Sequence, residues 1–196
     1  MVKSLACSFA VLLAVGTMGS SVHAATYTLD AAHTTIGFSV RHMMVSNVKG
    51  SFGEFEGTIE FDETNPSAMT ASASIKVASV DTANEKRDDH LRNEDFFDAP
   101  QFPTITFVTT RVEGALPNLT LVGDLTIKGV TKEVSIPVEV GGPIANPWGQ
   151  IVIGLSGGTT INRQDFGLTW SKSLDGGGVV VGDEVKLILE IEATKQ

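Results

Sequence analysis

The sequence predicts an all-β fold, an eight-stranded antiparallel barrel with one short helical insertion. From Thr26 onward, apolar and polar residues alternate with a period of two, which is typical of half-buried strands. Glycine-rich breaks separate the later stretches, and a single stretch has the features of a helix. Together these patterns indicate one domain of short antiparallel strands with one helical crossover.

Eight stretches carry the alternation. In the stretch 55–61, for example, Phe55, Gly57, Ile59 and Phe61 share one face, and the residues between them are polar. The stretches are 36–40, 55–61, 71–77, 105–107, 119–127, 134–140, 151–155 and 185–191. We expect a turn at Lys128-Gly129 and corners at the glycine-rich segments 141–143, 157–158 and 176–178.

The helical stretch follows a possible capping box, Thr82-Ala83-Asn84-Glu85. In a capping box the threonine hydroxyl and the glutamate carboxylate satisfy two free backbone N–H groups. The helix should then run over residues 86–92, with Leu91 as its inward anchor.

Side-chain size favours a barrel over a sandwich. Small residues lie on or beside inward faces that elsewhere carry Phe, Ile and Leu; they are Gly57, Ala71, Ala73, Gly123, Gly154 and Gly157. An eight-stranded barrel either fills its interior with side chains or holds one small ligand, and this pattern favours the ligand. A glycine in a strand also marks a bend, so bend and cavity stay equal alternatives at these positions.

The first 24 residues have the layout of a secretory signal peptide. Lys3 precedes a short apolar run, and Val22-His23-Ala24 supplies a cleavage site, which leaves residues 25–196 as the mature domain. That domain has 13 Lys and Arg against 23 Asp and Glu, a net charge of −10, and no cysteine. The net charge argues against nucleic acid or an anionic membrane surface as a partner, because both need clustered Lys and Arg. We expect a periplasmic location.

Several segments are similar to the YceI-like family. The first are Asp30-Ala31-Ala32-His33-Thr34, residues 38–43 and residues 50–57, followed by Arg87-Asp88-Asp89-His90-Leu91, Asp95-Phe96-Phe97-Asp98 and Phe102-Pro103. The later ones are residues 123–131, Asn162-Arg163-Gln164-Asp165-Phe166-Gly167 and Val181-Gly182-Asp183. The resemblance runs in order over the mature chain.

The resemblance implies a lipocalin-like barrel, extended by a helix, whose apolar interior encloses a polyisoprenoid or a similar long lipid. Apart from that lipid, we expect no cofactor or metal. Some relatives are encoded or fused with membrane cytochromes, so a membrane cytochrome or a quinone-pathway protein is a candidate partner. A homodimer stays open beside the monomer.

The candidate ligand-binding residues are mostly aromatic and aliphatic side chains on inward faces, because burial of isoprenoid CH₂ groups gives affinity with few polar contacts. They are Phe38, Val40, His42, Met43, Phe55, Ile75, Phe96, Phe97, Phe107, Leu125, Ile127, Ile153, Phe166 and Trp170. For His42, a core histidine bonded to a carbonyl and a head-group ligand are the main alternatives. Arg41 is a further head-group candidate, but its place in the alternation points it outward.

Two clusters of charged residues are better explained by a role in stabilising the fold than by catalysis or metal binding. Arg87, Asp88 and His90 lie within one helical turn, yet residues two apart do not share a helix face, which disfavours a metal site. Paired Asp88 and Asp89 fit an exposed helix face. Arg163 and Asp165 should form a buried bridge at one barrel end.

Three functions follow from these patterns. The first is a carrier or store for a polyisoprenoid, such as a quinone-like or prenyl carrier lipid. The second is an enzyme acting on such a lipid with His42 or His90 as acid or base, although no nucleophile motif supports catalysis. The third is a stress-induced protein that binds whatever apolar molecule is abundant.

Overall fold

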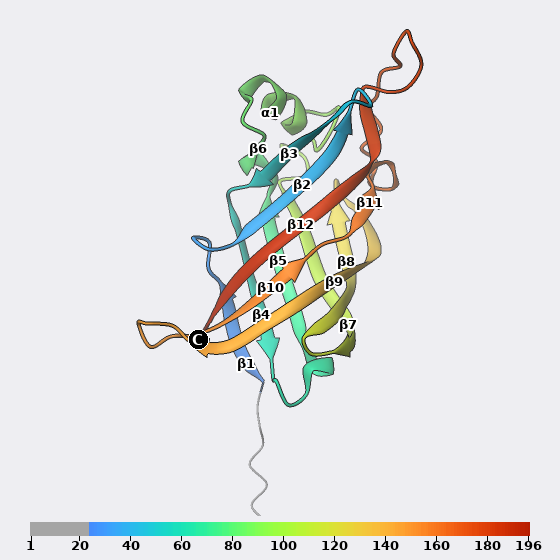
Figure 1. Ribbon diagram of the computed structural model, residues 1–196. Helices are drawn as coiled ribbons and strands as arrows, with labels where there is room; N and C mark the ends of the chain where they lie inside the picture. The colour runs from blue at the N-terminus through green and yellow to red at the C-terminus, as the bar shows by residue number, and fades with distance from the viewer. Residues whose placement is uncertain (1–23) are drawn as a thin grey trace, which may run out of the picture.

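A computed structural model describes residues 24–196, and the predicted signal peptide lies outside them except for Ala24. Eight antiparallel strands close into a barrel (Figure 1). In ring order they are β1 (Ala25–Leu29), β4 (Phe55–Phe61), β5 (Thr70–Lys76), β7 (Thr104–Ala115), β8 (Asn118–Ile127), β9 (Val130–Ala145), β10 (Ile151–Gly157) and β12 (Val181–Lys195). The predicted eight-stranded barrel is therefore confirmed.

The last strand, β12, closes the ring with two different partners along one edge. Its end pairs with β1, where Leu29 lies opposite Ala193. Its beginning pairs with β2 (Thr35–His42), which continues into β3 (Ser46–Phe52) and the short β6 (Val80–Asp81). On its other edge β12 pairs with β10 and with β11 (Thr160–Asn162). The C-terminal part of β12 thus closes the ring against β1. Its N-terminal part pairs with β2 instead, so the sheet continues there into β3 and β6.

The helical insertion α1 (Glu85–Arg92) lies over this extended end, beside β6 (Figure 1). Its cap differs from the predicted capping box. Asn84 is the N-cap and accepts a hydrogen bond from the Arg87 backbone N–H. Thr82 instead donates its backbone N–H and its hydroxyl to Asp88. Within residues 24–196, no helix is long and apolar enough to span a bilayer.

Other local predictions were incomplete. The segment 46–52 alternates too weakly to predict a strand, because its side chains are mostly polar, yet it pairs with β2 as β3. The predicted corner at 141–143 lies inside β9, where it makes a register shift against β10 instead of ending the strand. The turns at Lys128-Gly129 and at 176–178 lie between strands as expected. Within residues 24–196 there are also three 3₁₀ turns, at Pro66–Ala68, Val77–Ser79 and Arg163–Phe166.

Two apolar clusters divide the interior. At the β1 end, Tyr27, Phe61, Met69 and Ile153 are among side chains that are at most 3% exposed, so this end of the barrel is filled. Burial raises the pKa of the Tyr27 phenol. At the α1 end, a second cluster is formed by Ile36, Phe38, Phe52, Ile75, Val77, Val80, Ile105, Leu125, Ile127, Ile161, Phe166 and Leu168. The cavity described next lies mainly among these residues, and it reaches the first cluster at Ile59, Leu121, Ile136 and Leu155.

Candidate ligand-binding cavity

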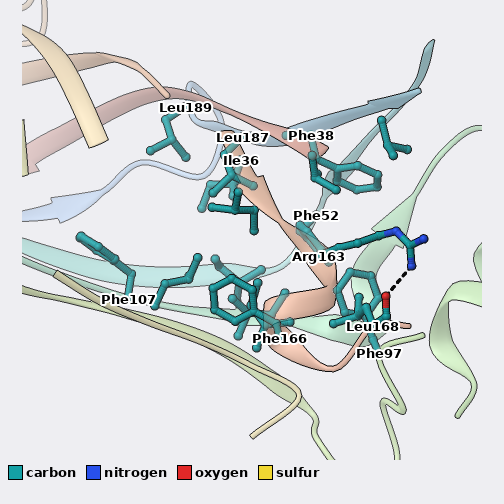
Figure 2. Close-up of a pocket in the computed structure, with 18 of the residues that line it drawn as sticks. Ile36, Phe38, Phe52, Phe97, Phe107, Arg163, Phe166, Leu168, Leu187 and Leu189 are labelled. Atoms are coloured by element: carbon teal, nitrogen blue, oxygen red, sulfur yellow. Dashed lines mark hydrogen bonds between the residues drawn. The ribbon is translucent and has the colours of Figure 1, made fainter. Parts of the chain in front are cut away.

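A cavity of about 310 Å³ occupies the barrel interior and opens toward α1. Strands β2, β5, β7, β8 and β12 supply its walls through alternate residues. Figure 2 shows Phe107 and Leu189 at one end of the row of lining side chains and Phe38, Phe52 and Arg163 toward the other. Its volume lies at the small end of the range for ligand sites, roughly 300–1,000 Å³.

Strand register brings the wall residues together. Phe38 lies opposite Leu187, and Ile36 lies opposite Leu189, so these four side chains form a continuous apolar surface across β2 and β12. Paired residues in an antiparallel sheet share a face, which makes a wall of this kind follow directly from the alternation.

Alanines make part of the space, but the glycines do not. Ala71 and Ala73 line the cavity from β5. A Cβ atom at Gly123 would lie 2.7 Å from the Phe107 ring, and one at Gly157 would lie 2.2 Å from the Pro137 carbonyl oxygen. A Cβ at Gly57 would lie 2.5 Å from the Ser72 carbonyl oxygen. These three glycines therefore allow close approach, and their missing side chains are not open space.

The ionisable residues that line the cavity are all arginine or histidine. Arg41 and His42 at the end of β2, Arg87 and His90 on α1, and Arg163 all line the cavity. Among the lining residues of the described chain, none is Asp or Glu. The mouth thus gathers cationic and neutral donors in a protein whose net charge is −9.

Arg163 is already fully engaged. It is 4% exposed, and its guanidinium donates to the carbonyl oxygens of Leu168, Trp170, Val181 and Gly182 and to Asp183. These bonds use all five N–H donors of a guanidinium. Burial lowers the pKa of Arg163, and Asp183 opposes that shift. The predicted buried bridge exists, but its partner is Asp183 and not Asp165.

Arg87 and Asp88 hold α1 onto the barrel. Arg87 donates from Nε to the Thr82 hydroxyl at 2.8 Å and from a terminal nitrogen to the Thr82 carbonyl oxygen at 2.8 Å. Asp88 is 6% exposed and accepts two bonds from Thr82, so the prediction of an exposed helix face was wrong for this residue. Arg87 keeps further N–H groups without a partner among residues 24–196 and presents a donor to the cavity.

His90 lies against aromatic side chains at the mouth. Its Nε2 is 2.9 Å from Asp95 Oδ2, and its ring meets the rings of Phe96 and Trp170 edge-on, with centroids 4.9 Å away in each case. Asp95 thereby orients the ring, but in residues 24–196 no serine, threonine or cysteine is hydrogen-bonded to His90. The pair therefore lacks the nucleophile of a catalytic triad.

Most of the predicted ligand-binding residues line the cavity. They are Phe38, Val40, His42, Ile75, Phe96, Phe97, Phe107, Leu125, Ile127, Phe166 and Trp170. Three do not. Met43 is 44% exposed on the turn after β2, and Phe55 packs beside the cluster at the α1 end. Ile153 belongs to the filled end, because alternation identifies the inward face but not the depth along the barrel.

The candidate residues omit several lining side chains. Val185, Leu187, Leu189 and Ile191 alternate visibly in the last stretch, so the signal for them was present in the sequence. Phe52 also lines the cavity, but the sequence did not predict it, because the other side chains of β3 are mostly polar and the strand was not recognised. Arg41 is exposed as its alternation indicated, and it donates to the Met44 carbonyl oxygen and to Asn47 at the edge of the mouth.

One group of possible metal ligands lies away from the cavity. The ligand atoms of Asp30, His33 and Glu192 are within 4.8 Å of one another, on the β1–β2 turn and β12. Asp30 already accepts bonds from the Ala32 backbone N–H and from His33 Nδ1, both at 2.8 Å. These hydrogen bonds stabilise the β1–β2 turn, which explains why the three side chains lie close together without a metal ion.

Barrel and cavity together define an antiparallel β-barrel protein with an apolar interior site. The chain belongs to the YceI-like domain family, whose model matches residues 27–193. A UPF0312 protein of Staphylococcus aureus (strain MSSA476) is 43% identical over 161 residues, which are 82% of this chain and 92% of that protein.

Two solved structures have the same fold. BcnA of Burkholderia cenocepacia is 28% identical with a TM-score of 0.75, and the match covers 85% of this chain and 99% of BcnA. A domain of Saccharophagus degradans described as polyisoprenoid-binding is 16% identical with a TM-score of 0.67, covering 87% of this chain and 98% of the domain. The second likeness concerns the fold alone.

Proposed function

We propose that this protein is an exported, periplasmic carrier or store for one long isoprenoid lipid, quinone-like or of the prenyl carrier type, and that it is not an enzyme. The observation that carries the proposal is the cavity of about 310 Å³, with aliphatic and aromatic walls and all its charged groups at one end. A chain lipid fits this division, with its tail along the walls and its head among the donors. The Saccharophagus degradans domain, described as polyisoprenoid-binding, offers a precedent for this ligand in this fold.

The walls alone account for useful affinity. Each buried CH₂ group contributes about 0.8 kcal/mol, so ten such groups would contribute roughly 8 kcal/mol before the costs of association. A membrane cytochrome or quinone-pathway protein is the partner class that such a carrier would serve.

The test is native mass spectrometry of the protein purified without detergent, followed by solvent extraction and identification of the released lipid. One isoprenoid bound in a ratio of one to one supports the proposal. An empty barrel that also fails to take up added farnesol or geranylgeraniol contradicts it. A heterogeneous mixture of lipids would instead favour a protein that binds any abundant apolar molecule.

The rival is an enzyme that uses His42 or His90 as acid or base, and the observation in its favour is the 2.9 Å contact between His90 and Asp95. A carrier should keep its bound lipid in His42→Ala and His90→Ala, with its affinity changed by less than about tenfold. In an enzyme, chemically altered lipid should be found with the wild-type protein and disappear in these variants. Chromatography of the extracted lipid before and after incubation decides between the two.

A further inference from the structure

The turn between β2 and β3 carries three consecutive exposed apolar side chains. Met43 is 44% exposed, Met44 is 54% exposed and Val45 is 77% exposed. The turn lies at the α1 end of the barrel, next to the segment that precedes β12 (Figure 1). The residues at its base, Arg41 and His42, line the cavity mouth. An apolar tip therefore projects beside the opening of the site.

The backbone of this tip is unfavourable for methionine. Met43 has φ of 49° and Met44 has φ of 61°, both in the left-handed region that favours Asn and Gly. Such residues are kept where the surroundings enforce them, and they concentrate at functional positions. Neither methionine belongs to the buried core, since both side chains are exposed.

The tip is nevertheless held in place. The Met43 backbone N–H donates to the Val180 carbonyl oxygen at 2.8 Å, and Val45 donates to His42 at 3.1 Å. Arg41 donates to the Met44 carbonyl oxygen at 3.0 Å. The exposed side chains are therefore presented on an ordered turn whose partner, Val180, also lines the cavity.

Cations lie behind the tip on the outer face of the sheet. Ser39 pairs with Lys49 on one side and with Lys186 on the other, and all three share the outer face with Arg41. Four residues of strand separate Ser39 from Met43, about 13 Å along the strand. Two acids share this face: Glu184 lies two residues before Lys186 on β12, and Asp81 lies opposite Ser51, two residues after Lys49.

We propose that Met43, Met44 and Val45 dock the cavity mouth onto a lipid bilayer, with the tip in the apolar boundary and Arg41, Lys49 and Lys186 near anionic head groups. Interfacial anchors combine apolar side chains that enter the boundary by about 5–10 Å with cations on the side facing the head groups. Docking there would let a lipid chain pass between cavity and bilayer without crossing water. The inference is independent of the ligand's identity.

The first test is sedimentation of the mature domain, residues 25–196, with vesicles of phosphatidylethanolamine and phosphatidylglycerol. Met43→Asn/Met44→Gly replaces the methionines with residues that the turn prefers, so the barrel should fold at least as well. We expect this variant to lose binding by tenfold or more. Lys49→Gln/Lys186→Gln should lose about fivefold for each lysine at low salt, and that difference should vanish at high salt.

Trp148 gives a matched control. It is 80% exposed on the β9–β10 turn, at the other end of β12, where Val152 pairs with Thr194. Trp148→Ser should leave vesicle binding unchanged. Since residues 25–196 contain no cysteine, a single environment-sensitive dye can be attached at Met44→Cys or at Trp148→Cys; its emission should shift to the blue with vesicles at the first site and not at the second.

Three results would overturn the inference. The first is equal sedimentation of the wild type and Met43→Asn/Met44→Gly with vesicles. The second is loss of vesicle binding in Trp148→Ser. The third is a wild type that does not bind vesicles but forms a dimer, which Met43→Asn/Met44→Gly converts to a monomer. Uptake of geranylgeraniol in solution is measured beside each variant. If uptake persists while vesicle binding is absent, docking fails and the carrier proposal survives; if uptake is absent, the carrier proposal fails on its own.

Discussion

Filling the cavity from β5 should weaken lipid binding without harming the fold. Ala73 lines the cavity in the middle of β5, where it pairs with Gly57 on one side and Phe107 on the other. Ala73→Leu adds three carbon atoms to the space that a lipid tail would use. At about 0.8 kcal/mol for each displaced CH₂ group, the loss is roughly 2.4 kcal/mol, or about 50-fold in Kd.

The same substitution should leave the empty protein as stable as before, or more stable by up to about 2 kcal/mol, because it fills part of a cavity. Titration of geranylgeraniol followed by native mass spectrometry gives the Kd, and urea unfolding gives the stability. Thr70→Leu, on the exposed end of the same strand, is the matched control and should leave the Kd unchanged. A folded Ala73→Leu protein with the wild-type Kd would refute the placement of the tail in this cavity.

Three further changes test groups outside the walls. Thr109 has a buried hydroxyl without a partner in the described chain, so Thr109→Val should raise the free energy of unfolding by about 1 kcal/mol or more in urea unfolding. Arg163→Met should lower the free energy of unfolding by about 3 kcal/mol or more, because it leaves four carbonyl groups without their donor, while Asp183 keeps its hydrogen bond from Gln164; a loss below about 1 kcal/mol would contradict the structural role. The hydrogen bond that His33 Nδ1 donates to Asp30 raises the pKa of His33 above 6.5, and the same bond lowers the pKa of Asp30 below 3.8. The stabilisation by His33 is thus present below pH 6.5 and lost as the pH rises through its raised pKa, while that by Asp30 is present above pH 3.8 and lost as the pH falls through its lowered pKa. Asp30→Asn should return the His33 pKa toward 6.5 in an NMR titration; an unchanged pKa would show that the pair does not form.

Much of the wall could be predicted from the sequence because alternation is a local property. Phe38, Leu125 and Leu187 each lie on an inward face that their neighbours along the chain reveal. Depth along the barrel is not local. Ile153 has the same alternation as its lining counterparts but lies in the filled cluster, because its position depends on the register between β10 and β12.

The mouth was less predictable because its contacts join segments with no shared pattern. Arg163 donates a hydrogen bond to Asp183, twenty residues away, and not to Asp165, because β12 places Asp183 beside the guanidinium. Thr82 has the sequence signature of an N-cap, yet its hydroxyl bonds Asp88, and Asn84 caps the helix. Competing hydrogen-bond partners of similar chemistry are resolved only by the tertiary arrangement.

A cavity of this size should make stability depend on the ligand. If about 310 Å³ stayed empty, the cost at roughly 24 cal/mol per Å³ would be on the order of 7 kcal/mol, which is comparable with the whole stability of a domain. The filled end, around Tyr27 and Met69, must therefore hold the fold while the other end stays open to a lipid. A ligand at 100 times its Kd adds about 2.7 kcal/mol, which for a chain of this length corresponds to a Tm increase of roughly 5–10 °C. We expect that increase when protein freed of lipid by solvent extraction and refolding is loaded with geranylgeraniol, and a smaller one for Ala73→Leu at the same lipid concentration. Equal Tm values for empty and loaded wild type would mean that the lipid does not bind the native barrel, and the cavity would then need another occupant.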